Sequence, residues 1–187
     1  MIITTDDFAP LHMGLFEKTW DLLHNEFPGM RLLAFTTWNY QNEGEVDKDK
    51  DFRKFCDVRA SWLELAMHGY VHLQPEGLLI DGYPLDALKK RWENYAKRSE
   101  CKIHLDYKPP YYKWNIRTLE VARDAGIKFF YVQDGILNLT TFEFYPRAVN
   151  KLIDTHTNLT TAMKDRIDVF LPELRKILQD ESTTNIL

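Results

Sequence analysis

A pair of histidines, in His68-Gly-Tyr-Val-His72, follows an apolar run from Trp62 to Met67 that predicts a buried strand. Neutral imidazole nitrogens bind zinc and other divalent transition metals, so two histidines this close in sequence can hold one ion. Two nitrogens do not complete a site, and the pair Asp6-Asp7, after the apolar run Met1 to Thr5, can supply the missing carboxylate. A surface loop with two ordinary histidines is the alternative, because short motifs often match by chance.

Strand-like and helix-like patterns alternate along the chain, which favours a parallel α/β arrangement. The expected strands cover residues 1–5, 31–37, 62–67, 127–132 and 151–155. The expected helices cover residues 15–27, 85–97 and 160–179, with another between the cap Asn115 and Gly126. Residues 41–51 are expected to form a polar loop, and residues 136–150 to be irregular.

Five polar residues come shortly after the predicted strands: Asp6, Asp7, His68, His72 and His156. In parallel α/β folds, functional sites gather beyond the carboxyl ends of the strands. The shared placement therefore indicates a single site.

The bulk composition describes an ordinary folded protein. Its 187 residues are expected to form one domain, 44% of them are hydrophobic and 28% are charged. The net charge of -4, with no dense block of Lys or Arg, argues against nucleic acid as a partner. Cys56 and Cys101 show no paired pattern, which indicates free thiols.

No apolar run approaches the roughly 20 residues of a membrane span. The N-terminus also lacks the basic and then apolar pattern of a secretion signal. We therefore expect a cytoplasmic protein without a membrane partner, and its oligomeric state is open.

One acidic stretch is similar to a calcium-binding loop in its first spacings, at Asp47, Asp49 and Asp51. Phe52 stands where such a loop requires Gly, and Val58 stands where it requires Glu. We interpret the stretch as a solvated turn.

The order of motifs resembles the polysaccharide deacetylases, the NodB-homology proteins of carbohydrate esterase family 4. The motifs are Thr-Asp-Asp after a strand, His-Gly-Tyr-Val-His after a strand, Lys-Pro-Pro, and a strand followed by His; together they span residues 4–156. The match is nearest to an uncharacterised branch with His-Gly-x-x-His. The resemblance implies a distorted (β/α)7 barrel, here trimmed and incomplete.

The resemblance implies that Asp7, His68 and His72 hold one divalent metal ion, usually zinc, with cobalt or nickel as alternatives. Gly69 replaces the usual Ser or Thr of the family, so another group must orient the imidazoles.

The resemblance also assigns roles in catalysis. Asp6 would be the general base, Lys108 would brace it where the family has Arg, and His156 would be the general acid. A structural role is the alternative for His156. For Lys108, a functional and a structural role are equally expected. Asp154 stands where the family prefers an apolar residue in the acetyl pocket.

The implied activity is removal of an N-acyl group, in the first instance N-acetyl, from an amino sugar or oligosaccharide. Tyr111, Tyr112 and Trp114 follow the two prolines and are expected to stack on the substrate, with core filling as the alternative. A metal-dependent hydrolase of a non-sugar amide, or an inactive relative that binds metal or glycan, are the alternatives.

Overall fold

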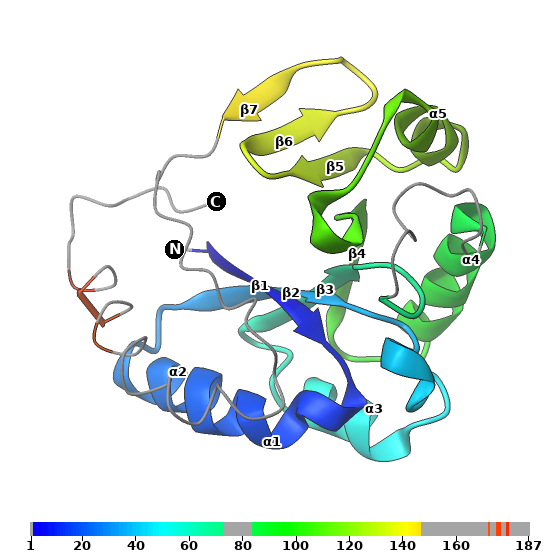
Figure 1. Ribbon diagram of the computed structural model, residues 1–187. Helices are drawn as coiled ribbons and strands as arrows, with labels where there is room; N and C mark the ends of the chain where they lie inside the picture. The colour runs from blue at the N-terminus through cyan, green and yellow to red at the C-terminus, as the bar shows by residue number, and fades with distance from the viewer. Residues whose placement is uncertain (1, 73–83, 147–171, 173–174, 177–178, 180–187) are drawn as a thin grey trace.

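The computed structural model describes residues 2–72 and 84–146, with residues 172, 175, 176 and 179 near the C-terminus. Its centre is one sheet of seven strands, which lie side by side in sequence order (Figure 1). The strands are β1 (Ile2–Phe8), β2 (Arg31–Thr36), β3 (Leu63–Met67), β4 (Lys102–Tyr107), β5 (Phe129–Val132), β6 (Gly135–Asn138) and β7 (Phe144–Pro146). Strands β1 to β5 are parallel, whereas β5, β6 and β7 pair antiparallel.

The sheet curves toward its own first strand. Thr4 of β1 lines the same pocket as Tyr145 and Pro146 of β7, together with Lys108 beyond β4. Within the described residues, β1 and β7 are nevertheless the two ends of the sheet, with no pairing between them. The α/β class and the incomplete barrel expected from the sequence are therefore confirmed.

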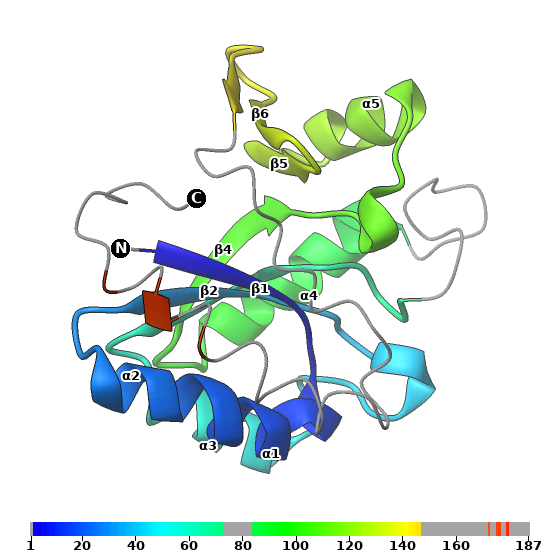
Figure 2. The ribbon, with the colours of Figure 1, turned by 60° about the vertical axis from the view of Figure 1, so that its left-hand side comes forward.

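Helices cover the convex side of the curved sheet. The helical segments are η1 (Pro10–His12), α1 (Met13–Phe16), η2 (Glu17–Asp21), α2 (Leu22–Glu26), η3 (Tyr40–Asn42), α3 (Lys50–Asp57), α4 (Leu85–Ala96), η5 (Pro110–Tyr112) and α5 (Ile116–Asp124). The α1, α2 and α3 helices lie on one side of β1 and β2 (Figure 2). Helix α4 contacts β4 and α5. None of the helices in the described ranges is both long and apolar enough to cross a membrane.

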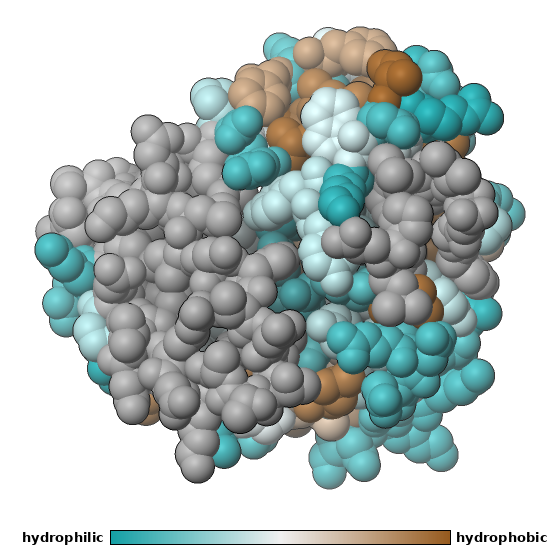
Figure 3. Space-filling view, in the orientation of Figure 1, coloured by the Kyte–Doolittle hydropathy of each residue, from teal (hydrophilic) through white to brown (hydrophobic). Residues whose placement is uncertain are grey.

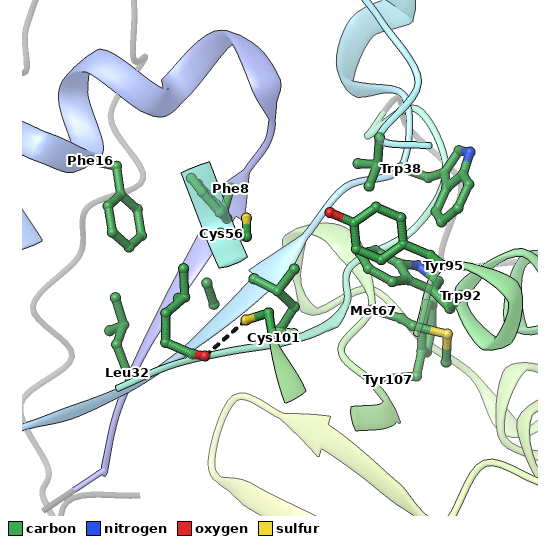
Figure 4. Packing of buried hydrophobic residues seen from close by; sticks show 14 of the residues in the cluster. Phe8, Phe16, Leu32, Trp38, Cys56, Met67, Trp92, Tyr95, Cys101 and Tyr107 are labelled. Carbon is green, nitrogen blue, oxygen red and sulfur yellow. Dashed lines mark hydrogen bonds between the residues drawn. The ribbon is translucent and has the colours of Figure 1, made fainter. Parts of the chain in front are cut away.

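The apolar core lies between the sheet and these helices (Figure 4). Trp38, Trp92 and Tyr95 meet edge to face, with Trp92 5.0 Å from Trp38 and 5.6 Å from Tyr95 between ring centroids. Cys56 and Cys101 are buried free thiols, and the Cys101 Sγ donates a hydrogen bond to a strand carbonyl 2.9 Å away. Apolar side chains also gather on the surface at the end of the molecule formed by β6, β7 and α5 (Figure 3).

One sequence prediction about a segment is wrong, and another is wrong only at its end. Residues 136–150 were expected to be irregular, yet most of β6 and all of β7 lie there because a tight turn after Val132 folds the chain back, pairing Val132 with Gly135. The expected polar loop 41–51 holds as far as Asp49 and then gives way to α3 at Lys50, because the Asp49 carboxylate caps that helix by accepting from the Phe52 amide at 2.8 Å. Strand 151–155 and most of helix 160–179 lie outside the described residues.

Strand β4 had no counterpart among the expected strands, because alternate residues are charged. Lys102 and His104 both contact the buried carboxylate of Glu64 on the neighbouring strand β3, so their polarity is satisfied within the sheet. The alternating polar residues of β4 are therefore compatible with a strand, because they contact a buried carboxylate on the neighbouring strand.

Replacing Trp92 with Ala tests the core. Trp92 is fully buried, so we expect Trp92→Ala to lower the free energy of unfolding by about 3–5 kcal/mol, through lost contacts and a cavity. Urea titration measures this change. Val58→Ala, at an exposed position, is the control and should change stability by less than about 0.5 kcal/mol. Similar losses in both variants would contradict the assignment of this cluster as the core.

Candidate metal centre

Three side chains from two distant parts of the chain converge at one end of the sheet. The Asp7 Oδ1 lies 3.0 Å from the His68 Nε2 and 2.7 Å from the His72 Nε2. All three potential ligand atoms lie within 4.8 Å of one another, and both imidazoles are buried. One carboxylate oxygen and two imidazole nitrogens form a donor set that suits zinc, cobalt or nickel.

The burial of these atoms supports the same reading. The Asp7 Oδ1 and the His68 Nε2 are buried, and among the described residues neither has a hydrogen-bond partner apart from the close approach of the Asp7 Oδ1 to the two imidazoles. Buried polar atoms are normally satisfied, so such a pair requires an explanation. A divalent ion between them would satisfy both, and the residues therefore fit this group.

A β-bulge in β1 aims both carboxylates at the site. The strand pairs regularly with β2 up to Thr5, and the register shifts before Phe8. Consecutive side chains of a regular strand point to opposite faces. The bulge, with a φ of +58° at Asp7, breaks this alternation, so Asp6 and Asp7 serve neighbouring parts of one site.

The loop that carries the histidines is also held in an unusual conformation. His72 has a φ of +59°, which costs about 1–2 kcal/mol for an L residue. Gly69, with a φ of +84°, is in a region that glycine adopts freely. Backbone amides of loop 38–41 donate to the carbonyls of residues 69–71 at N···O distances of 2.6–3.2 Å, and these bonds hold the loop in place. The strained φ of His72 thus occurs in a loop that these hydrogen bonds hold in one conformation.

Lys108 connects the two halves of the site. Its Nζ lies 2.6 Å from each carboxylate oxygen of Asp6, and both side chains are buried. Its backbone amide donates to the Met67 carbonyl at 3.0 Å, and its own carbonyl accepts from the His68 Nδ1 at 2.8 Å. With Nδ1 engaged in this last hydrogen bond, the His68 Nε2 faces Asp7. The same bond fixes the orientation of the ring, a role that a hydroxyl at position 69 would otherwise have.

The carboxylates are held in their charged form. Burial alone raises the pKa of Asp6, but the Lys108 ammonium and the neighbouring His68 bring it below its ordinary value. Burial likewise raises the pKa of Asp7, and hydrogen bonds and charge from both histidines outweigh it, so the pKa falls well below its usual range. Asp6 and Asp7 are therefore both ionised at neutral pH.

The structure puts two of the three expected substrate-contacting aromatics beside the site. The ring of Tyr111 lies 4.7 Å from that of His72, and the ring of Tyr112 lies 4.5 Å from the Lys108 Nζ. Trp114 instead meets Phe130 edge to face at 6.3 Å and leaves 42% of its surface exposed. The expected acid His156, and Asp154, lie outside the described residues.

Sequence reasoning missed two residues of the site, His12 and Tyr40. The His12 Nδ1 donates to the backbone carbonyl of Asp7 at 2.5 Å, and the Tyr40 ring stacks on His72 at 5.3 Å. Burial lowers the pKa of His12, and burial with the nearby Asp7 charge raises the pKa of Tyr40 to about 12. The one sequence signal was the position of His12, five residues after Asp7, in a Pro-containing turn.

Replacing Lys108 with Met tests the buried ion pair. Lys108→Met leaves the Asp6 carboxylate buried without its cation, so we expect the free energy of unfolding to fall by about 3–5 kcal/mol. Adding Asp6→Asn should recover part of the loss, because an amide carries no charge. Urea titration of both single variants and the double variant measures the coupling. The control Arg117→Met, at an exposed ion pair, should change stability by less than about 1 kcal/mol, and an equal effect there would contradict the interpretation.

Comparison with known proteins gives structural likenesses at low sequence identity. No protein-family model matches the chain, and neither does any curated protein. One similar solved structure is BA3943 from Bacillus anthracis, described as a CE4 family pseudoenzyme, with 16% identity, a TM-score of 0.47, and coverage of 67% of this chain and 41% of that chain. Another is the deacetylase domain of BpsB from Bordetella bronchiseptica, with 16% identity, a TM-score of 0.47, and coverage of 74% of this chain and 67% of that one.

This chain thus spans less than half the length of the Bacillus anthracis structure.

Proposed function

We propose that this chain is a metal-dependent hydrolase of the polysaccharide-deacetylase type, which removes an N-acyl group, in the first instance N-acetyl, from an amino sugar or oligosaccharide. The observation that carries the proposal is the convergence of Asp7, His68 and His72. Beside them lies a second carboxylate, Asp6, held by Lys108. A ligand cluster next to a positioned base is the arrangement that metal-assisted hydrolysis requires.

The metal ligands in this proposal are Asp7, His68 and His72. A divalent ion held there, zinc in the first instance, would polarise the acyl carbonyl and ease the loss of a proton from water. Three protein ligands leave positions open for water and substrate. The Lys108 carbonyl keeps the His68 ring in the required orientation through its Nδ1.

The proton transfers fall to the chain's own side chains. Asp6 accepts a proton from the attacking water at a carboxylate oxygen, and Lys108 keeps that carboxylate ionised and oriented. An amine leaves poorly unless it is protonated, so an acid is needed on the leaving side. His156 remains the expected acid on the strength of the motif order alone.

A sugar substrate is supported by the aromatic side chains at the site. Tyr111 is 41% exposed although its ring lies beside His72. Flat aromatic faces next to a catalytic centre suit the apolar faces of sugar rings. Tyr112, which lies against the Lys108 ammonium, would contribute to the same wall.

One observation favours a second candidate, an inactive relative that binds metal or glycan. Both oxygens of Asp6 lie 2.6 Å from the Lys108 Nζ, and this contact lowers the basicity of the carboxylate. A base held in this way accepts a proton less readily. The two candidates share the metal site and differ in turnover.

Metal content tests the site itself. After reconstitution with zinc and removal of excess ion, we expect about one equivalent of metal per chain, as for a single three-ligand site. His72→Ala should lose it, because one of the three ligands is removed. His24→Ala is the matched control and should keep the metal, because His24 lies in α2 and stacks on Trp62 away from the three ligands. Full metal content in His72→Ala would contradict the ligand assignment.

Acetate release from N-acetylated oligosaccharides tests catalysis. Asp6→Asn should keep the metal and lower kcat by about 10²–10⁴-fold, because the amide accepts no proton. The control Asp134→Asn, in the turn after β5, should keep full activity. Glycan binding without turnover in the unaltered, metallated protein would favour the inactive relative, and turnover only of non-sugar amides would move the substrate class. Full activity in Asp6→Asn would refute the assigned base.

A further inference from the structure

We infer that His12 is a positioning residue for the metal centre: its Nδ1–H holds the backbone of Asp7 in the conformation that aims the carboxylate at His68 and His72. The inference rests on the proposed function, since it assigns His12 to the same centre. It adds a residue outside the aspartate, histidine and lysine motifs on which the resemblance depends.

The first support is the hydrogen bond itself. Asp7 lies inside the β1 bulge, outside the regular register with β2, and its φ is +58°. Its carbonyl therefore needs a partner that a regular ladder would otherwise give. The His12 Nδ1 gives that partner at 2.5 Å, from the short turn η1 that begins only three residues after Asp7.

The second support is the environment of the His12 ring. Its ring is buried, and its Nε2 is buried with no hydrogen-bond partner among the described residues, so Nδ1 is the nitrogen that makes the side-chain hydrogen bond. The metal-ligand cluster found among the described residues includes Asp7, His68 and His72 and not His12. His12 therefore acts on the site through Asp7 and is not itself a ligand.

The third support is a contact with the opposite ligand. The His12 ring meets Tyr40 edge to face at 4.8 Å, and Tyr40 stacks on His72 at 5.3 Å with an interplanar angle of 24°. One side chain thus contacts the backbone of one ligand and, through one aromatic ring, the side chain of another. The hydrogen bond and the ring contact can be separated by mutation.

The experiment compares three substitutions at this position. His12→Phe keeps an aromatic ring against Tyr40 but loses the donor. His12→Asn keeps an N–H near the place of Nδ1 but loses the ring. His12→Gln carries its N–H farther out, near the place of Nε2, where it does not reach the Asp7 carbonyl. His24→Phe makes the same chemical change in α2 and is the matched control.

The readouts are the affinity for Zn²⁺, measured by competition with a chelator, and the visible absorption spectrum of bound Co²⁺, which reports ligand geometry. We expect His12→Phe and His12→Gln to bind Zn²⁺ about 10–100-fold more weakly with an altered Co²⁺ spectrum, the usual loss for a partner of a metal ligand. His12→Asn should stay within about threefold of the unaltered protein, well inside that range. His24→Phe should match the unaltered protein in both readouts.

Unchanged affinity and spectrum in His12→Phe and His12→Gln would overturn the inference while leaving the metal site intact. A larger loss in His12→Asn than in His12→Phe would also overturn it, because ring packing would then be the cause. Absence of metal binding by the unaltered protein would overturn the proposed function as well. Should His12→Phe fail to fold by circular dichroism, the comparison of Asn with Gln decides, since both are polar amides of similar size.

Discussion

The site depends on one buried ion pair between strands that are not neighbours in the sheet. Asp6 comes from β1 and Lys108 follows β4, with β2 and β3 between them. Two charges removed from water must compensate each other, because their desolvation is expensive. The curvature of the sheet brings the two side chains together across its concave side. The position of Asp6 in the candidate centre therefore depends on how the sheet curves.

The same lysine acts through its main chain as well as its side chain. Its amide is fixed on the end of β3, its carbonyl orients His68, and its ammonium holds Asp6. A point charge lacks the planar fork of Arg, yet here the ammonium lies equally close to both carboxylate oxygens. Cation–π contacts with Tyr112 and Phe35 confine it further. The proposed base Asp6 and one expected metal ligand are thus positioned by a single residue.

Much of this arrangement could be predicted from the sequence, because it depends on local patterns. Apolar runs gave β1, β2, β3 and β5, and the polar residues just after them gave Asp6, Asp7, His68 and His72 as members of one site. Carboxyl ends of parallel strands share an edge, so no knowledge of strand order was needed.

What the sequence concealed depends on long-range partners. The polar residues of β4 become compatible with a sheet only once Glu64 of β3 lies beside them. His12 looked like any other histidine, because its role follows from the conformation of Asp7, which no residue pattern specifies. The short strands β6 and β7 owe their existence to pairing with each other and with β5. Periodicity carries none of this information.

The β1 bulge has a consequence for how this segment tolerates changes in length. It contributes one extra residue between the last regular pair at Thr5 and the pair at Phe8, and that extra residue lets two successive carboxylates serve one centre. Removing a single amino acid there would restore simple alternation and turn one of the two acids to the opposite, helix-covered side. For this short segment, the number of residues therefore matters as much as their identity, and an alignment that slipped by one position would hide the difference between an intact centre and a broken one.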